Sequence, residues 1–218
     1  MPDAAAAEPA AKKKSTHAAE RDRADVVAKR AVWFDRFADR RVVDLIFIDE
    51  FGANTKMQRT HGRAAPGERV VASVPHSHYK TISTIAALST KGVIASASFD
   101  GGTTAAKFVD FITENLIPKL RKGQVVVLDN LAAHNDRRVD ELIEAAGCEV
   151  MRLPPYSPDY NPIENAISKI KTMLRKLAKR TVLGLFDGIN TAMESITVAD
   201  AKAFIRNCGY ATMRRNPL

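Results

Sequence analysis

The chain has 218 residues, 45% of them hydrophobic, which is enough for one sizeable core with appended helices but too little for two full domains. A formal net charge of +8 suits a polyanionic partner. Its two distant cysteines exclude a disulfide scaffold or a cysteine zinc site, and the lack of a long apolar run excludes a membrane span, so we expect a reduced, cytoplasmic protein.

Two segments precede the most apolar part of the sequence. Residues 1–17 are rich in alanine and end in a short lysine run, which predicts a disordered leader. Residues 18–40 repeat apolar side chains such as Val26, Trp33 and Phe37 at helical spacing. We therefore expect an amphipathic helix packed on the main domain.

The next stretches predict three antiparallel strands and a further short strand in the loop after the first. Residues 42–48 form a compact apolar run that stops at Asp49, so we expect a central strand with this aspartate at its exposed carboxyl end. Residues 52–75 read as a basic loop with a short strand near residues 69–73. The alternating stretches 81–88 and 92–98 flank a Lys-Gly turn and predict a hairpin.

Helices and strands then alternate to the end of the chain. The periodicity predicts helices over 103–120 and 137–146, strands over 124–128 and 149–153, a helix opened by Glu164, and two last helices around 186–196 and 199–207. Three antiparallel strands followed by two further strands with helices between them predict a mixed five-stranded α/β sheet flanked by helices.

A proline-rich loop, Leu153–Glu164, leads into the Glu164 helix. Four prolines within nine positions restrict its backbone, so the loop delivers the helix to a set place. Asn161 can act as the helix N-cap and Pro162 suits the first helical position. Glu164 also occupies the capping-box position, so its carboxylate has a structural as well as a catalytic interpretation.

Three carboxylates stand at the ends of elements that this topology can bring together. Asp49 and Asp129 each follow a strand, and Glu164 opens the helix after the last strand. Such carboxylates repel one another unless a cation supplies the opposite charge. Oxygen ligands favour Mg²⁺ or Mn²⁺ over zinc, and a third carboxylate suits two ions that act on a phosphodiester.

The same stretches resemble a known enzyme family. Phe47-Ile48-Asp49-Glu50, Val126-Val127-Leu128-Asp129-Asn130 and the proline-rich loop through Glu164 resemble the catalytic core of bacterial insertion-sequence transposases of the mariner-like superfamily, which are DDE enzymes with a ribonuclease-H-like, integrase-type fold. Thirty-four residues separate Asp129 from Glu164, as in such enzymes. The resemblance implies that Asp49, Asp129 and Glu164 bind two Mg²⁺ ions, with Mn²⁺ able to substitute.

Further expectations come from the resemblance. It implies DNA strand cleavage and strand transfer at transposon ends and target DNA, a homo-oligomer on DNA, nucleoid association, and an upstream helix-turn-helix half of the transposase. The expected domain limits are a leader over 1–17, the helix over 18–40, the catalytic domain over 41–182 and a helical extension over 183–218. A catalytically silent DNA-binding remnant and a structure-selective nuclease of the same fold remain as alternatives.

Several other residues are candidates for supporting roles. Glu50, Asn130 and His134 could support the metal site, although Asn130 also suits a turn and His134 a bond to the backbone. A basic series on the Glu164 helix and in the loop after the first strand predicts contacts with the DNA backbone. These residues are Lys169, Lys171, Arg175, Lys176, Lys179, Arg180, Arg59, Arg63 and Arg69.

Overall fold

A five-stranded mixed sheet forms the centre of the protein. The computed structural model describes residues 17–74, 76, 80–131 and 136–210. The strands are β1 (Leu45–Asn54), β2 (Thr81–Ser89), β3 (Gly92–Asp100), β4 (Val125–Leu128) and β5 (Glu149–Arg152), in the order β3-β2-β1-β4-β5. β1, β2 and β3 pair antiparallel, whereas β4 and β5 run parallel to β1. The predicted fold class is therefore confirmed.

Helices cover both faces of this sheet. They are α1 (Ala24–Ala31), α2 (Ala105–Asp110), α3 (Arg137–Ala145), α4 (Pro162–Leu177), α5 (Val182–Glu194) and α6 (Val198–Asn207). α2 continues through a π-helical turn (Phe111–Leu116) and a 3-10 turn (Ile117–Lys119), which matches the predicted helix over 103–120. Within the described residues, no helix is long and apolar enough to cross a membrane.

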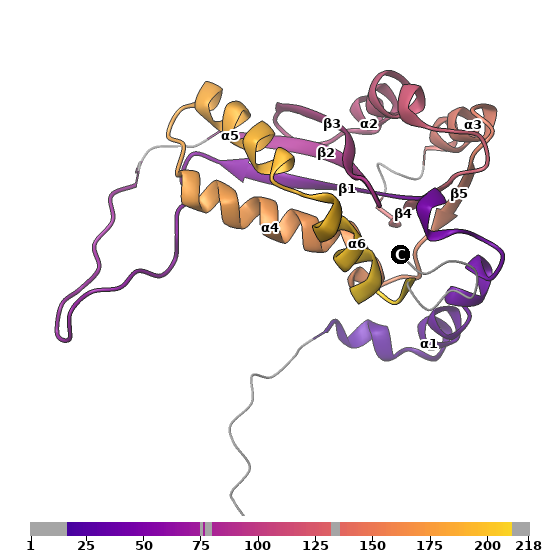
Figure 1. The fold of residues 1–218 in the computed structure, drawn as a ribbon, viewed down its shortest axis with the longest axis horizontal. Coiled ribbons are helices and arrows are strands. Elements are labelled where there is room, and N and C mark those ends of the chain that lie inside the picture. Colours follow the sequence, from indigo (N-terminus) through magenta and orange to yellow (C-terminus); the bar gives the residue numbers. More distant parts are fainter. Residues whose placement is uncertain (1–16, 75, 77–79, 132–135, 211–218) are drawn as a thin grey trace, which may run out of the picture.

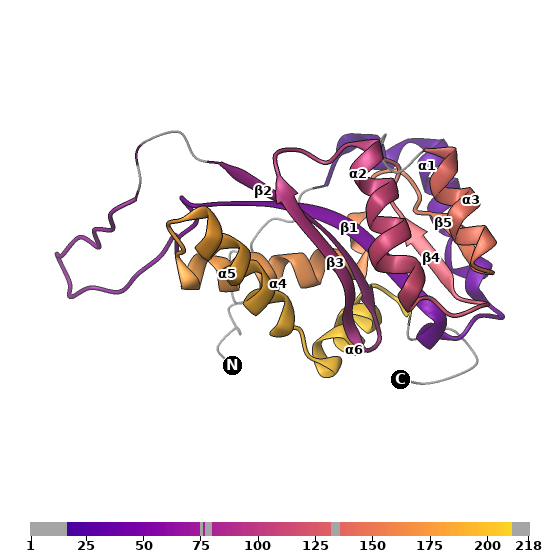
Figure 2. The same ribbon diagram turned by 90° about the horizontal axis from the view of Figure 1, so that it is seen from above.

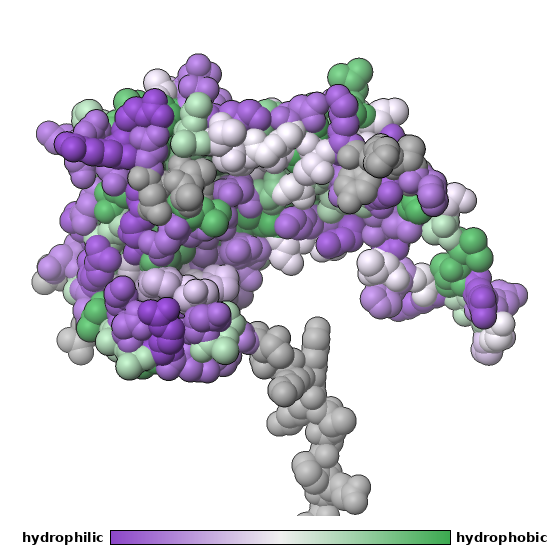
Figure 3. All heavy atoms as spheres, turned by 180° about the vertical axis from the view of Figure 1, so that it is seen from behind, coloured by the Kyte–Doolittle hydropathy of each residue, from purple (hydrophilic) through white to green (hydrophobic). Residues whose placement is uncertain are grey.

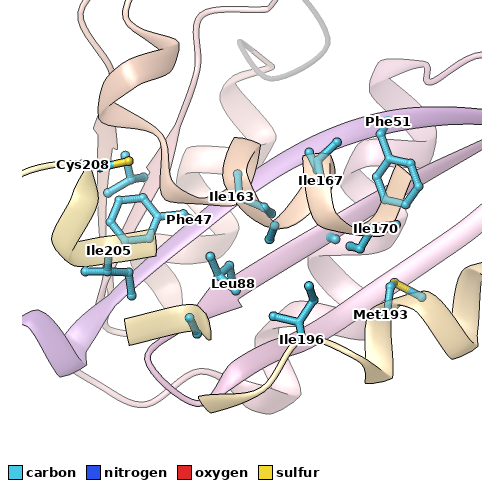
Figure 4. Close-up of a cluster of buried hydrophobic side chains, with 14 of the residues drawn as sticks. Phe47, Phe51, Leu88, Ile163, Ile167, Ile170, Met193, Ile196, Ile205 and Cys208 are labelled. Atoms are coloured by element: carbon cyan, nitrogen blue, oxygen red, sulfur yellow. The ribbon is translucent and has the colours of Figure 1, made fainter. Parts of the chain in front are cut away.

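The two faces of β1 bury two separate apolar clusters. Phe47 and Phe51 point to one face and pack with α4, α5 and α6, whereas Ile46 and Ile48 point to the other and pack with α2 and α3. Figure 4 shows Phe47, Ile163, Ile167 and their neighbours meeting in the first cluster. Figure 2 shows the two helical layers on either side of the sheet. Because side chains alternate along a strand, Asp49 lies on the same face as Phe47 and Phe51.

β1 is longer than its sequence predicts. It pairs with β2 from Phe47 to Asn54, so Asp49 lies inside the strand and the expectation that it ends the strand is wrong. The physical reason is that the antiparallel partner β2 continues to offer backbone hydrogen bonds where the parallel neighbour β4 has already stopped. Asp49 is thus beyond the parallel pair but within the antiparallel one.

The segment before the sheet folds as short pieces. In place of one helix over 18–40, it forms a 3-10 turn (Ala19–Asp22), α1 and a second 3-10 turn (Phe34–Phe37), followed by a third (Val42–Asp44). Trp33 and Phe37 are fully buried in the α4-side cluster, as expected for core residues. Figures 1 and 2 show α1 at the end of the molecule where β4 and β5 lie.

The connection from β1 to β2 forms a projecting arm. Between Asn54 and Thr81 the described residues form no strand, so the expected strand near residues 69–73 is wrong. Without a neighbouring chain to pair with, its β-branched residues stay exposed, as Val70 and Val71 do. Figures 1 and 3 show this arm extending away from the body of the protein.

The last two helices belong to the main core. Leu185 and Ile189 of α5, and Ala201 and Ile205 of α6, are buried in the same cluster as α4. α5 packs on α4 and the first three strands, and α6 packs on α4 and β3. The segment after residue 182 therefore completes one face of the sheet.

Candidate active site

Asp49 and Asp129 are brought together by the parallel pairing of β1 with β4. Phe47 pairs with Val127, and each aspartate lies two positions beyond its member of that pair. Continuing this register sets the two aspartates abreast on neighbouring strands, with side chains on the same face. The backbone N–H of Leu131 donates to Oδ1 of Asp129 at 3.0 Å and so holds the turn after β4.

Glu164 reaches the same place through the proline-rich loop. It lies in the first turn of α4, and its exposed side chain stands apart from the buried stripe that includes Ile163 and Ile167. Negative charge in the first turn suits the positive end of the helix dipole. α4 packs along β1, so its amino-terminal end lies against the part of the strand that carries Asp49.

Asn161 has a different role from the predicted one. Asn161 occupies the predicted N-cap position of α4, but its side chain makes no N-cap hydrogen bond to the helix. No capping box forms there, because the Asn161 N–H donates to the carbonyl of Pro158. Instead, Nδ2 of Asn161 donates to Oδ2 of Asp49 at 2.9 Å. The structural interpretation of Glu164 as a capping residue therefore loses its support.

The three carboxylates line one cleft of about 380 Å³. Its walls come from the end of β4, the proline-rich loop and the start of α4: Asp49, Asp129, Asn130, Leu131, Leu153, Pro154, Pro155, Tyr156, Ser157, Pro158, Asn161 and Glu164. Asp49 is only 7% exposed. Burial first, and then the negative charges of Glu164 and Asp129, together raise the pKa of Asp49 from 3.8 to about 7, against the lowering effect of the hydrogen bond from the Glu50 N–H.

The cleft is not a closed metal site as it stands. Within the described part of the chain, no group of three carboxylates, imidazoles or thiols is placed to hold a metal ion. The donor chemistry nevertheless fits a hard cation, because the site offers oxygen ligands only. Oδ1 of Asn161 is also buried with no hydrogen-bond partner among the described residues, as expected of an acceptor that faces an additional bound group.

The residues predicted to support the site differ in what they contact. The main chain of Glu50 donates to Oδ1 of Asp49 at 2.8 Å, so this residue supports the aspartate through its backbone. Nδ2 of Asn130 donates to the carbonyl of Leu153 at 2.6 Å and ties the turn after β4 to the start of the proline-rich loop. His134 lies outside the described residues.

A family model decides the affiliation of the chain. The model described as "DDE superfamily endonuclease" matches residues 44–182, more than half of the sequence. The chain belongs to the DDE superfamily endonucleases. A comparison with curated protein sequences gives no match.

Solved structures with the fold of this DDE endonuclease domain include several of Mos1 transposase. A Mos1 paired-end complex with the left transposon end matches with a TM-score of 0.75 at 15% identity, over 92% of this chain and 64% of that chain. The Mos1 strand transfer complex matches with a TM-score of 0.69 at 17% identity, over 93% of this chain and 62% of that chain. The crystal structure of the catalytic domain of Mos1 mariner transposase matches with a TM-score of 0.63 at 14% identity, over 90% of this chain and 91% of that chain. The chain thus has the fold of that catalytic domain and spans less than two thirds of the longer Mos1 chains.

Four of the predicted DNA-binding residues of this DDE endonuclease domain line a second groove. Arg59 at the base of the arm faces α4 across a space of about 550 Å³. The α4 side of the groove carries Lys169, Arg175 and Lys176, with Thr172 and Met173 between them. α4 starts at the carboxylate cleft, and this basic groove lies farther along the same helix.

The remaining basic residues have different surroundings. Arg63 and Arg69 are exposed farther out on the arm, Lys171 is half-buried on α4, and Lys179 is exposed. Arg180 donates to the carbonyls of Thr55 and Met57 and so joins the end of α4 to the arm. Within the groove, Lys169 forms an ion pair of 2.6 Å with Asp200 of α6.

The sequence did not identify two residues that the structure connects to the carboxylate cleft. The pattern around Asn161 predicts a helix cap, and nothing in a single sequence shows that the side chain of such an asparagine bonds to a distant carboxylate. Arg30 falls within the helix predicted over 18–40, yet it is buried and contacts the proline-rich loop. Its only sequence signal is a charged residue on the apolar face of a helix.

Proposed function

We propose that this domain cleaves DNA strands and joins them to new positions by metal-dependent phosphoryl transfer. The observation that carries the proposal is the meeting of Asp49, Asp129 and Glu164 at one cleft from three separate elements. Membership of the DDE endonucleases supports the same reaction class. A buried carboxylate with two further carboxylates nearby is a costly arrangement without a cation, which makes a metal-binding role the best account of it.

The three carboxylates would hold Mg²⁺, or Mn²⁺ in its place, as two ions. Mos1 structures were solved with Mg and with Mn, which supports this choice of metals. The bound cations supply positive charge that stabilises the attacking and leaving oxygens of a phosphodiester. Glu164 is exposed and Asp129 half-buried, so their side chains have room to turn toward the fixed carboxylate of Asp49.

The chain's own contribution is to hold this ligand set in place. Asn161 and the backbone N–H of Glu50 each donate to one oxygen of Asp49, which sets the orientation of that carboxylate. The Leu131 N–H does the same for one oxygen of Asp129. Carboxylates fixed in this way need little reorganisation when substrate binds.

DNA would lie along the basic groove between α4 and the arm. Arg59, Arg175 and Lys176 line that groove without an opposing carboxylate among its lining residues. Lys171, Lys179, Arg63 and Arg69 extend the positive surface on either side. Contacts of this kind bind the phosphate backbone independently of base sequence. Lys169 and Arg180 would add charge while also holding α6 and the arm.

The substrates are inferred by analogy with the Mos1 complexes. Those structures contain a left transposon end in a paired-end complex and a strand transfer complex. We therefore infer that transposon ends and target DNA are the substrates, that two or more copies act together, and that an upstream helix-turn-helix segment recognises the ends. The protein would then work with the nucleoid in the cytoplasm.

The test is strand cleavage and joining by purified protein. Duplexes that carry the terminal repeats flanking the gene are incubated with Mg²⁺ or Mn²⁺ and a plasmid target, with the upstream half added in a second series. We expect nicked ends and joined products, both lost in Asp129→Asn. Asp187→Asn, an exposed aspartate on α5, is the matched control and retains activity. Wild-type rates in Asp129→Asn would show that the assignment of this residue is wrong.

Two other functions give different outcomes in the same assay. A structure-selective nuclease of this fold cuts branched or flapped DNA but forms no joined product. A catalytically silent remnant binds DNA, cuts nothing, and gains no thermal stability from Mg²⁺ or Mn²⁺, because ligand binding to the folded state must raise its melting temperature.

A further inference from the structure

Arg30 of α1 is bonded to the proline-rich loop more than 125 residues away. Its guanidinium donates to Oγ of Ser157 at 2.6 Å and to both carboxylate oxygens of Asp159 at 3.0 and 2.7 Å. The same group lies 4.0 Å from the centre of the Tyr160 ring. Arg30 is only 9% exposed, so Ser157, Asp159 and Tyr160 form a buried socket for its guanidinium.

A second set of contacts holds the same loop from its other side. The Tyr210 hydroxyl donates to the carbonyl of Tyr160 at 2.8 Å and accepts from Nε1 of Trp33 at 3.0 Å. The Phe34 ring packs edge-on against both tyrosine rings, at 4.9 and 5.3 Å between centres. The residues after α1 therefore continue the socket that Arg30 begins.

The held loop is the part of the chain that delivers two groups to the carboxylate cleft. Asn161, the donor to Asp49, comes directly after Tyr160, and Glu164 lies one helical turn later. The loop contains a strained backbone position, since Tyr156 has φ of 54°, a region that non-glycine residues avoid. Such a conformation persists only where surrounding contacts hold it.

The electrostatics of the socket favour a fixed ion pair. Burial acts to raise the pKa of Asp159, but the hydrogen bonds and charge of Arg30 outweigh it and lower the pKa. Arg21 adds a second, more exposed contact to the same carboxylate at 3.1 Å. Asp159 itself is 39% exposed at its side chain, so its charge would remain in contact with water after loss of Arg30.

We propose that Arg30 is a positioning residue, which holds Ser157–Tyr160 so that Asn161 and Glu164 reach Asp49. This inference rests on the proposed DNA-cutting function and adds a link between the segment before β1 and the reacting centre. Displacing α1 would loosen the proline-rich loop and lower the activity of the cleft, so α1 and the cleft are coupled through this loop.

The test combines a double-mutant cycle with measurements on the loop. Single-turnover cleavage at saturating DNA is measured for Arg30→Ala, Asp159→Ala, the double variant, Arg30→Lys and the control Arg36→Ala, whose side chain stacks on Trp33 instead of the loop. We expect each alanine variant to lose about tenfold to a hundredfold in rate with its DNA affinity within about twofold of wild type. The double variant should be no more than about threefold slower than the slower single variant. Arg30→Lys should have an intermediate cleavage rate, and Arg36→Ala should have the wild-type rate.

Two further readouts separate this inference from the proposed function. Hydrogen exchange of the amides in 156–161, measured on metal-free protein, should speed up at least tenfold in Arg30→Ala and stay unchanged in Arg36→Ala. Mn²⁺ affinity, measured by magnetic resonance of the ion, should fall in parallel. If the wild type cuts no DNA, the proposed function fails while the exchange measurement still tests the positioning.

Three outcomes would overturn the inference. One is a double variant whose loss equals the product of the two single losses, because the residues then act independently. Another is Arg30→Ala with a lower melting temperature but wild-type cleavage rate, since the contact would then serve stability alone. The third is unchanged exchange in 156–161, which would mean that Arg30 does not hold the loop.

Discussion

The side-chain amide of Asn161 donates to Oδ2 of Asp49 at 2.9 Å, across 112 positions of the chain. This bond joins the residue before α4 to the middle of β1, inside the cleft that the three carboxylates share. It makes the orientation of the most buried carboxylate depend on the proline-rich loop. The loop therefore does more than carry Glu164.

Replacing Asn161 with alanine should slow DNA cleavage by about tenfold to a hundredfold, because a hydrogen bond to a charged group contributes roughly 1.5–3 kcal/mol. Single-turnover rates at saturating metal measure this. Asn165→Ala is the matched control, since that exposed asparagine on the next turn of α4 contacts Cys208 instead of the carboxylates. An Asn161→Ala rate within twofold of wild type would contradict the role assigned to this amide.

The metal-free protein should lose stability as the pH rises from about 4 to about 7. The pKa of Asp49 is raised to about 7 in the fold against an ordinary value of 3.8, so the folded state binds the extra proton across that window. The unfolding free energy therefore falls with rising pH. Asp49→Asn should remove this dependence and stabilise the protein by about 2–4 kcal/mol at pH 8.5. Chemical unfolding in the presence of a chelator measures both the pH dependence and the stability change. If the unfolding free energy of Asp49→Asn falls with pH as steeply as that of the wild type, Asp49 is not the group responsible.

Cation binding should be coupled to proton release from the same carboxylate. Because Mg²⁺ must displace the Asp49 proton, its affinity should increase about tenfold per pH unit below 7 and level off above it. Calorimetry in buffers of different ionisation enthalpy measures the proton release directly. Glu164→Gln should weaken Mg²⁺ binding without abolishing the pH dependence, whereas Asp49→Asn should abolish it.

Removing one basic residue from the groove should weaken DNA binding equally for all sequences. For Arg175→Ala or Lys176→Ala we expect the slope of log affinity against log salt to decrease by about 0.9, as for the loss of one phosphate contact. Fluorescence anisotropy at several salt concentrations measures the slope. Lys91→Ala serves as control, because Lys91 is an exposed lysine in the β2–β3 turn at the opposite end of the sheet from the arm. An equal change of slope in that variant would argue against the groove.

Tyr210→Phe should destabilise the protein by about 1–3 kcal/mol, because it removes an acceptor from Trp33 and a donor to Tyr160 in a buried place. The ring contacts with Phe34, Phe37 and Phe47 remain, so the fold should survive. Thermal and chemical unfolding measure the loss. Tyr156→Phe, which alters an exposed ring in the same loop, should change the unfolding free energy by less than about 0.5 kcal/mol.

The sequence alone was sufficient to predict the order of elements and the five strands, and it proposed Asp49, Asp129 and Glu164, which the structure brings to one cleft. Each of these depends on information that is local in the chain: a compact apolar run, a helical period, an acidic residue at the end of an apolar run, and a proline-rich motif with a set spacing. The sequence-based prediction failed where the conformation of one segment depends on contacts with another segment. The length of β1 was set by its pairing with β2, and the straight helix expected over 18–40 was broken to fit its buried rings against the core.

Only the tertiary structure decided which polar side chains serve the carboxylates. The side chain of Asn161 donates to Asp49 instead of capping its own helix, and the side chain of Arg30 is buried against Asp159. In both cases the charged partner lies more than 100 positions away in the chain. Such pairings arise from the relative placement of sheet, loop and α1, and no periodicity within one segment records them. Local sequence therefore predicts which acidic residues the cleft contains, whereas the contacts that orient their side chains form only when distant segments pack together.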